Sequence, residues 1–280
     1  MMTPGRPAAL ASLFREDASL SESVQWLQQV YLRRLENRPE AEEVERLVLM
    51  LLDDGLLPEG MRVQKVDSVG LWVETPEGQS LALASLSDGY RTVAGLVLDL
   101  IKQLVSAFDS VAVETDSDGR LVVLHEGIVL IDEVDVHLHV EWQKRIGFWL
   151  KDHFPRMQFI VTTHSPFICQ AADEGGLVRL SPPWQGGAAA EILTGEEFNR
   201  VVNGTVDEAV MTDLFGLDTV LSEASRDVRH RTAEIEAAAL SRDLTAAEQG
   251  ELERLRSRLP SSQSDRAVQS MMSIEWARGQ

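Results

Sequence analysis

The stretch GIVLIDEVDVHLH, residues 127–139, determines the fold that we predict for this chain of 280 residues. An apolar run, Ile128–Ile131, ends in two adjacent carboxylates, Asp132 and Glu133. Such a run, bounded by polar residues, is typical of a buried strand in a parallel sheet. An amphipathic helix follows, and then a second apolar strand, Met157–Val161, which ends in TTHSP. Strand, helix and strand in this order predict a βαβ unit with a right-handed crossover, and hence an α/β fold.

Upstream of this unit the sequence has a helical period. Apolar residues recur every three or four positions after LSDGYR, residues 86–91, which predicts one long helix. The same period predicts helices over 20–35 and 41–52. Ser19, with Glu22 three residues later, has the pattern of a capping box, so we expect the first of these helices to open there.

Short strands and a second helical region complete the pattern. An alternating period predicts antiparallel strands over 61–66, 70–74 and 80–84. Near the C-terminus, 227–240 and 245–259 are rich in Ala, Glu, Arg and Leu, which predicts an antiparallel helical hairpin. We therefore predict an N-terminal region of helices and antiparallel strands (1–84), an α/β core (85–190) and a C-terminal helical region (191–280).

Composition limits the functions that the chain can have. The formal charge is −19, from 26 basic and 45 acidic residues, which argues against a surface built for general binding to a nucleic-acid backbone. The single cysteine, Cys169, excludes an intrachain disulfide, and we expect it to be a small core residue rather than a nucleophile. The sequence lacks a signal-peptide pattern and any apolar run of the ~18 residues that span a bilayer. We therefore expect a cytoplasmic protein that does not contact membranes.

Asp132 and Glu133 are the first candidate site residues. An acid at the carboxyl end of a parallel strand lies at the edge of the sheet where α/β proteins bind ligands. Two acids at this position repel each other unless a cation or a proton intervenes, so the pair favours a metal-dependent reaction. A strand that simply ends in a polar turn explains the same two residues equally well.

Two further segments contain candidate site residues. In LSDGYR, Ser87, Asp88 and Gly89 precede the long helix, which offers a hydroxyl, free backbone N–H groups and the positive end of a helix dipole to an anion. An ordinary helix N-cap would have the same sequence. In TTHSP, His164 follows the second strand of the βαβ unit, where a neutral imidazole can bind a phosphate or a water. A lone histidine in such a place is more often structural.

The three segments together, LSDGYR, LIDEVDVHLH and IVTTHSP, resemble the C-terminal half of an ABC-type ATPase head. The most similar members are AAA-type ATPases of chromosome maintenance, DNA repair and phage defence. The resemblance covers about residues 85–180, the predicted α/β core, and implies a P-loop NTPase-like parallel sheet flanked by helices. It implies that LSDGYR is the signature motif, whose nucleotide-binding residues are Ser87, Asp88, Gly89, Tyr90 and Arg91. Ser87 and Gly89 would reach the γ-phosphate of ATP held by an opposing head.

The resemblance also assigns roles in ATP hydrolysis to the residues after each strand. Asp132 would hold Mg²⁺ and Glu133 would be the general base that polarises the attacking water (Walker B). Asp135 and His137 would lie in the loop that links the two nucleotide sites across a dimer. His164 would be the switch histidine.

One expected element of such a head has no counterpart in this sequence. None of the four lysines follows a glycine, so no segment matches the phosphate-binding loop, or Walker A motif, G-x-x-x-x-G-K-[ST]. Three explanations remain open. The loop could belong to a separate polypeptide, the reading frame could start upstream of the first methionine, or the chain could be a remnant that does not hydrolyse ATP.

Basic residues are concentrated in the predicted helical hairpin of this acidic chain. They are Arg226, Arg229, His230, Arg231, Arg254, Arg256 and Arg258. Solvated helix faces with pairs of opposite charge explain them. A docking element for an effector or for nucleic acid is the alternative.

The sequence therefore leads to one main hypothesis and two alternatives. The main hypothesis is a Mg²⁺-dependent ATPase head that acts as a homodimer, or as a heterodimer with a chain that has a Walker A loop. It could drive an effector such as a nuclease, and the sequence leaves open whether it contacts nucleic acid. One alternative is a catalytically inactive scaffold of the ATPase fold that binds protein partners. The other is a metal-dependent nuclease that uses Asp132, Glu133 and Asp135.

Overall fold

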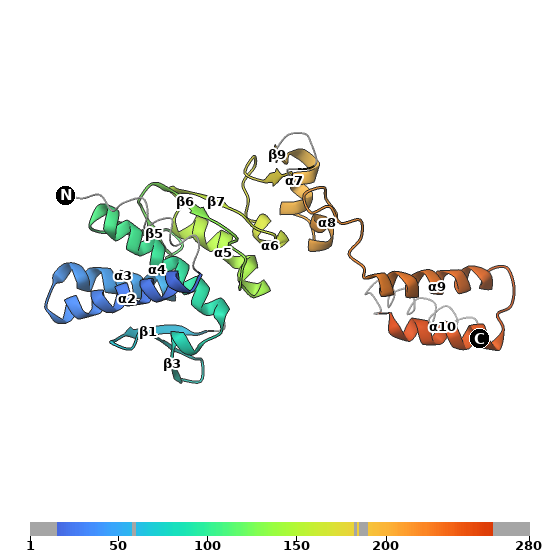
Figure 1. Cartoon of the computed structure of the whole chain (residues 1–280), viewed down its shortest axis with the longest axis horizontal. Coiled ribbons are helices and arrows are strands. Elements are labelled where there is room, and N and C mark those ends of the chain that lie inside the picture. The colour runs from blue at the N-terminus through green and yellow to red at the C-terminus, as the bar shows by residue number, and fades with distance from the viewer. Residues whose placement is uncertain (1–15, 58–59, 182–183, 185–189, 260–280) are drawn as a thin grey trace. The chain divides into compact units, whose positions relative to one another are not determined.

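The computed structural model describes residues 16–57, 60–181, 184 and 190–259 (Figure 1). The chain divides into two compact units, one that ends at Phe215 and one that begins at Gly216. None of the helices in the described ranges has an apolar stretch long enough to cross a bilayer.

The first unit alternates helices with short strands. Its elements are, in order, α2 (Glu16–Leu35), α3 (Pro39–Asp53), β1 (Arg62–Val66), β2 (Leu71–Glu74), β3 (Ser80–Ala82), the 3₁₀ turn η2 (Leu83–Ser85), α4 (Asp88–Phe108), β4 (Val113–Thr115), β5 (Leu121–Val123), β6 (Gly127–Ile131), α5 (Val140–His153), β7 (Met157–Val161), α6 (Pro166–Cys169), β8 (Val178–Leu180), β9 (Ala190–Ile192), α7 (Gly195–Val202) and α8 (Val206–Val210). The predicted α/β class is confirmed.

The βαβ unit has the predicted form. Strands β6 and β7 lie side by side and pair in parallel, with Ile131 opposite Val161 at their carboxyl ends (Figure 1). Helix α5 connects them and buries Trp142, Ile146 and Trp149, which confirms that this face of the helix belongs to the core. Helix α4 buries its own apolar stripe in the same core cluster, so the two helices fix the position of the strands.

The prediction that both strands are buried is wrong for one face. Ile128 and Leu130 are 69% and 70% exposed, and Ile160 is 51% exposed. Their neighbours in the strands, among them Val129 and Phe159, pack against the core instead. The reason is that this sheet contains only β6 and β7 within the described residues, and the core covers one side of it. The apolar run is a strand with two apolar faces, one packed against the core and one exposed to solvent.

The N-terminal helices and strands are also found where the periods predict them, with one exception. Strands β1, β2 and β3 form an antiparallel sheet, and α2 and α3 pack with α4. Helix α2 (Glu16–Leu35) already contains Ser19, where we expect the helix to open, and the side chain of Ser19 lies outside the described part of the structure. A helix can extend upstream of its apolar pattern through residues that lack the pattern, which is why helix ends are hard to predict.

Asp54, at the C-terminal end of α3, ties this N-terminal layer to the βαβ unit. Its carbonyl accepts a hydrogen bond of 2.7 Å from the indole Nε1 of Trp149. Its carboxylate accepts one of 2.8 Å from the backbone N–H of Leu121 and lies 3.3 Å from Nε2 of the buried His153. These contacts hold α5, and thereby the loops at both of its ends, against the rest of the unit.

The predictions gave no separate elements to the segment after α6. There the hairpin β8–β9 and the short helices α7 and α8 enclose a second, smaller core, which contains Cys169, Leu177, Leu193 and Val201. Cys169 is buried, as predicted. Strands β8 and β9 have three residues each, which gives an alternating pattern little length in which to appear.

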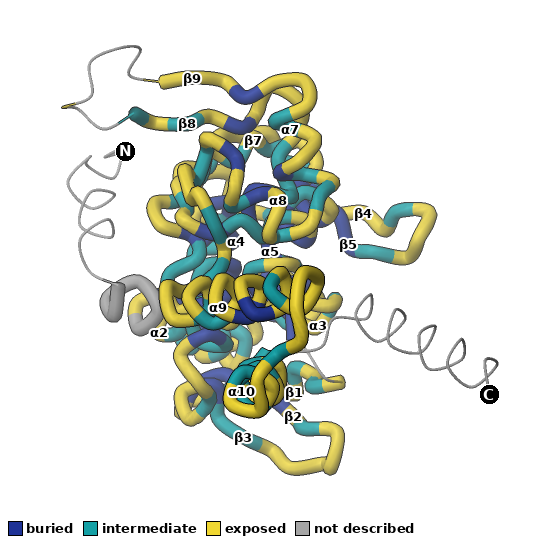
Figure 2. Tube along the Cα trace, turned by 90° about the vertical axis from the view of Figure 1, so that its right-hand side faces the viewer, coloured by how far each residue is buried: buried dark blue, intermediate teal, exposed yellow. Residues whose placement is uncertain are grey.

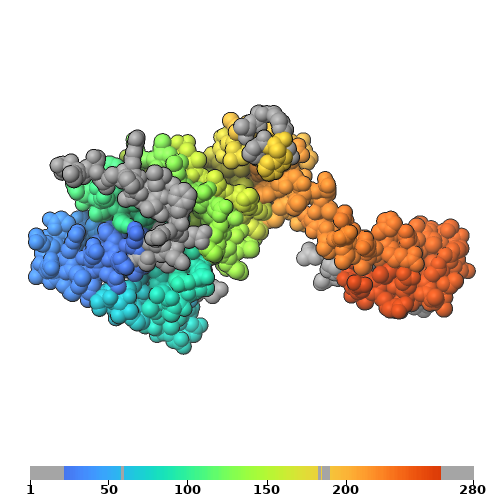
Figure 3. Space-filling view, in the orientation of Figure 1, coloured from blue at the N-terminus to red at the C-terminus, as the bar shows by residue number. Residues whose placement is uncertain are grey.

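The second unit is the predicted helical hairpin, α9 (Glu223–Ala239) and α10 (Ala246–Arg258), which forms a closely packed body of its own (Figure 3). Thr245 and Glu248 form the predicted capping box at the start of α10. Helix α9 is largely exposed and buries only Thr232 and Ile235 among its described side chains (Figure 2). The expected tail beyond Leu259 lies outside the described residues.

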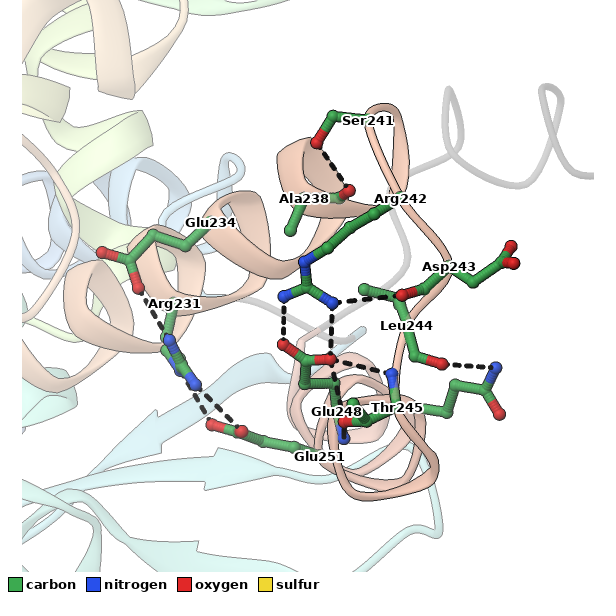
Figure 4. Close-up of polar contacts among 11 residues, drawn as sticks. Arg231, Glu234, Ala238, Ser241, Arg242, Asp243, Leu244, Thr245, Glu248 and Glu251 are labelled. Atoms are coloured by element: carbon green, nitrogen blue, oxygen red, sulfur yellow. Dashed lines mark hydrogen bonds and ion pairs between the residues drawn. The ribbon is translucent and has the colours of Figure 1, made fainter.

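Ion pairs join the two helices of this hairpin. Arg231 binds Glu251 with Nε 2.8 Å from Oε1, and Arg256 binds Glu236 with Nη2 2.7 Å from Oε1. At the turn, the guanidinium of Arg242 donates hydrogen bonds to both carboxylate oxygens of Glu248 (Figure 4). Of the basic residues singled out in this hairpin, Arg231 and Arg256 are thus paired within it, which supports the simpler explanation of solvated, paired helix faces for these two.

Candidate functional site

The carboxyl ends of β6 and β7 meet through Thr162. Its backbone N–H donates to the carbonyl of Ile131 at 3.0 Å, and its own carbonyl accepts from the N–H of Val134 at 3.1 Å. Its hydroxyl donates to the carboxylate of Asp132 and accepts from the backbone N–H of Glu133 at 2.7 Å. The parallel register therefore places the two acids beside the TTHSP segment, as the βαβ unit predicts.

Glu133 takes a backbone conformation that is unusual for its residue type. Its φ is 48°, in the left-handed region that residues other than glycine seldom adopt. The N–H bond to Thr162 and a bond of 3.0 Å from the N–H of Val136 to the carbonyl of Glu133 hold this turn. Asp132 and Glu133 are both exposed, so a ligand at this edge of the sheet has access to both carboxylates. Strained backbone of this kind often occurs where side chains must be aimed at a reaction.

Asp135 connects the same loop to the predicted switch histidine. Its Oδ1 accepts from the hydroxyl of Thr163 and, at 3.3 Å, from the backbone N–H of His164. Asp135 is half-buried and His164 is exposed. The structure thus brings together four of the residues that the sequence singles out, Asp132, Glu133, Asp135 and His164.

A further connection between the two loops was not predicted. The side chain of Gln143, in the first turn of α5, lies between them and contacts Leu138 on one side and Ser165 on the other. Thr162 and Thr163 belong to the TTHSP segment, in which only His164 was predicted to have a role. A hydrogen bond from a side chain to a loop carbonyl leaves no periodic signal in a sequence, so only the polar TTHSP segment hinted at this network.

The start of α4 packs against the loop after β6. Gly89 is buried, and a Cβ atom there would lie 3.3 Å from the carbonyl oxygen of His137 and 3.7 Å from the backbone nitrogen of His139. Tyr90 meets Trp142 of α5 edge to face, with 6.5 Å between the ring centroids. The LSDGYR segment and the loop after β6 are therefore in direct contact.

The other residues of LSDGYR lie at the start of α4. Ser87 is the N-cap of α4, and its hydroxyl makes no capping bond. Asp88 pairs with Arg91 three residues later. In the described part of the chain no hydrogen bond joins Ser87, Asp88 or Arg91 to Asp132 or Glu133. Ser87 and Asp88 are exposed at a helix N-terminus, where N–H groups favour an anion.

The site suits a cation only together with ligands from elsewhere. Within the described ranges, no group of three His, Cys, Asp or Glu side chains is arranged to hold a metal ion. Mg²⁺ is usually bound through one or two carboxylates, with phosphate oxygens and waters completing its six ligands. The exposed carboxylate of Asp132 fits that incomplete donor set, whereas an autonomous nuclease centre of Asp132, Glu133 and Asp135 does not fit this arrangement.

Cys169 is not a candidate nucleophile. Burial, reinforced by the negative charge of Asp135, raises the pKa of its thiol to about 11. The thiolate, which is the reactive form, is therefore scarce at neutral pH.

Comparison with known proteins connects this geometry to a family. The family described as "AAA domain, putative AbiEii toxin, Type IV TA system" matches residues 9–170. The Septu protein PtuA of Bacillus thuringiensis is 30% identical over 171 residues, which are 60% of this chain and 41% of that protein. The Retron Ec83 probable ATPase of Escherichia coli is 33% identical over 138 residues, which are 49% of this chain and 22% of that protein. The chain thus spans less than half the length of these relatives.

Solved structures show a weaker similarity. The SMC head domain from Thermotoga maritima has 22% identity and a TM-score of 0.35, with 55% of this chain and 46% of that chain covered. A second structure, of SMC ATPases that dimerise with ATP, has 19% identity and a TM-score of 0.40, with 60% and 89% covered.

Proposed function

Because this chain belongs to the family described as "AAA domain, putative AbiEii toxin, Type IV TA system", we propose that it supplies the catalytic carboxylates and the signature segment of an ATP-hydrolysing head. One observation carries the proposal: Thr162 joins the carboxyl ends of β6 and β7, so that Asp132, Glu133 and the segment with His164 share one edge of the sheet. Ligands bind at this edge in α/β proteins.

Glu133 is the general base of the proposed reaction. Its carboxylate accepts a proton from water as the water oxygen bonds to the γ-phosphorus and the bond to the bridging oxygen of ADP breaks. Asp132 holds Mg²⁺, which neutralises charge on the phosphates when it is bound. His164, exposed beside them, binds the γ-phosphate or the attacking water.

The phosphate-binding loop comes from outside the 280 residues. Without a Gly-Lys pair the printed sequence has no Walker A motif, and Asp132 alone does not complete a Mg²⁺ site. We propose that a second polypeptide or additional upstream sequence provides the loop. The uncovered apolar face of β6 and β7, with Ile128, Leu130 and Ile160, supports a head that is completed by further chain.

The proposed assembly is a dimer with ATP at the interface. Ser87 and Gly89 of one head face the γ-phosphate bound by the other, and the loop with Asp135 and His137 links the two sites. The contact of Gly89 with the backbone of that loop supports this link. We propose that hydrolysis drives an effector, such as a nuclease, as the resemblance to defence and repair ATPases implies.

Replacement of Glu133 by Gln tests the proposed reaction. The variant keeps the size of the side chain and loses the base, so we expect ATP turnover to fall about 10²–10⁴-fold while ATP stays bound. Phosphate release and the size of the assembly by light scattering measure the two effects, with the chain co-expressed with its genomic neighbours. Glu126→Gln is the matched control, because Glu126 is exposed immediately before β6.

Two outcomes would count against the proposal. Equal turnover by Glu133→Gln and wild type would exclude Glu133 as the base. If no co-expressed neighbour gives Mg-ATP binding, the chain is an inactive scaffold of the ATPase fold.

A further inference from the structure

Gln143 uses both ends of its amide to join the two loops of the site. Its Nε2 donates to the carbonyl of Leu138 at 2.9 Å and lies 3.5 Å from the carbonyl of Asp135. Its Oε1 accepts from the hydroxyl of Ser165 at 2.7 Å. One side chain on α5 therefore contacts the loop after β6 and the loop after β7.

The hydroxyl of Ser165 bonds to Gln143 and does not cap a helix. It is buried, and it is the N-cap of α6, where a serine hydroxyl commonly accepts from the backbone of the first turn. The hydroxyl makes no such bond and donates to Gln143 instead. Because a buried hydroxyl without a partner is unfavourable, removal of the Gln143 amide would leave Ser165 to reorient.

The same loop is held on its other side by the start of α4. Gly89 lies against the backbone of His137 and His139, and Leu138 between them accepts the hydrogen bond from Gln143. Ser165 directly follows His164, whose N–H is bonded to Asp135. Packed and hydrogen-bonded groups thus run without a gap from the signature segment to the switch histidine.

We propose that Gln143 is a positioning residue that fixes His164 relative to the loop Asp135–Leu138. The proposal rests on the proposed ATPase function. It adds a route by which a displacement of the signature segment at one nucleotide site moves the histidine at the other site. Gln143 itself touches no reacting atom. A movement of one loop displaces the other through Gln143, because the two ends of its amide bind two loops that each contain a residue proposed to take part in hydrolysis.

A double-mutant cycle between Gln143 and Ser165 tests the proposal. Gln143→Leu keeps the approximate shape and removes both polar contacts, and Ser165→Ala removes the hydroxyl. We expect each single variant to lower kcat for ATP about tenfold, the effect of roughly one hydrogen bond. KM should stay within about twofold, since neither residue binds ATP, and the double variant should be no slower than the slower single variant.

Gln143→Glu refines the cycle, because its carboxylate still accepts from Ser165 but cannot donate to the loop carbonyls. A kcat as low as that of Gln143→Leu is expected. Gln103→Leu on the exposed side of α4 is the matched control, and it should leave kcat unchanged. Multiplying defects in the double variant, or a changed KM with an unchanged kcat, would overturn the proposal.

Backbone hydrogen exchange gives a readout that does not need ATP turnover. In Gln143→Leu the N–H groups of His164 and Ser165 should exchange at least about tenfold faster than in wild type, since the segment loses one of its attachments. Unchanged exchange there would overturn the proposal even if kcat falls. A wild-type assembly that hydrolyses no ATP would refute the proposed function instead, and exchange would still decide whether Gln143 fixes the segment.

Discussion

At Gly89 the absence of a side chain lets the start of α4 lie against the loop after β6. A Cβ atom at 3.3 Å from the carbonyl of His137 is closer than ordinary van der Waals contact, and the neighbour is backbone, which yields less readily than a side chain. The glycine of LSDGYR therefore has a role in packing besides the proposed contact with phosphate.

Replacement of Gly89 by Ala should displace this loop without unfolding the chain. We expect ATP turnover to fall at least about tenfold, while the melting temperature changes by a few degrees at most, since alanine favours the helix by about 1 kcal/mol and offsets the crowding. Gly250→Ala on α10, where a Cβ meets nothing within 4 Å, is the control. It should raise stability and leave turnover alone, and wild-type turnover in Gly89→Ala would contradict the packing argument.

Cys169 permits a second test at the scale of one residue. Burial raises its pKa to about 11, so a thiol reagent at pH 7.5 should modify the native chain far more slowly than the unfolded chain. The rate should increase as the pH approaches that value. A cysteine introduced at the exposed Ser117 gives the modification rate of an accessible thiol. Equal modification rates at the two positions would show that burial does not protect Cys169.

Ion pairs join the two helices of the hairpin and hold its turn. Both carboxylate oxygens of Glu248 accept from Arg242, and the backbone N–H of Thr245 donates to Oε2 at 2.8 Å (Figure 4). These donors hold the pKa of Glu248 far below its ordinary value of 4.5. A carboxyl whose pKa is lowered by folding stabilises the folded state above its ordinary pKa, and this contribution is lost as the pH falls.

We therefore predict that acid weakens the hairpin through Glu248. Helix content of the full chain by circular dichroism should decrease as the pH is lowered from about 5 towards 2. Glu248→Gln should have lower helix stability at pH 7 and a smaller further loss in acid, because the side chain no longer titrates. Glu253→Gln, on the exposed side of the same helix, is the control, and an identical acid response of all three proteins would refute the prediction.

The elements also show which features a sequence can predict. The stripe of α4 and the order of β6, α5 and β7 follow from periods that repeat over many residues, so they were predicted correctly. The exposure of Leu130 was not predicted, because the identity of an apolar residue does not show whether another part of the protein covers it. Gln143 was missed because its partners are a backbone carbonyl in the preceding loop and a hydroxyl in the loop after β7, and neither contact leaves a periodic signal. The three residues of β8 span little more than one alternation of a strand, so they give only a weak signal.

For the whole molecule, the division at Gly216 predicts where the chain is open to cleavage. Leu217 and Val220 lie at the start of the second unit and are 49% and 44% exposed. Thermolysin, which cuts before apolar residues, should first cut within 216–221 and release two fragments of the sizes that this division gives. Mass spectrometry identifies the site. Initial cleavage inside α4 or α5 would show that the division does not describe the folded chain.

His137 has a consequence for how this loop evolves. It is exposed, yet its φ is 63°, a conformation that β-branched residues avoid and that Asn, Asp, His and Gly tolerate. Any residue at this position must accept this main-chain conformation, whatever its side chain contacts. A histidine that is invariant among descendants of this gene could record the narrow set of residues able to turn there. At this position, an unchanged histidine alone does not show that the imidazole takes part in the chemistry.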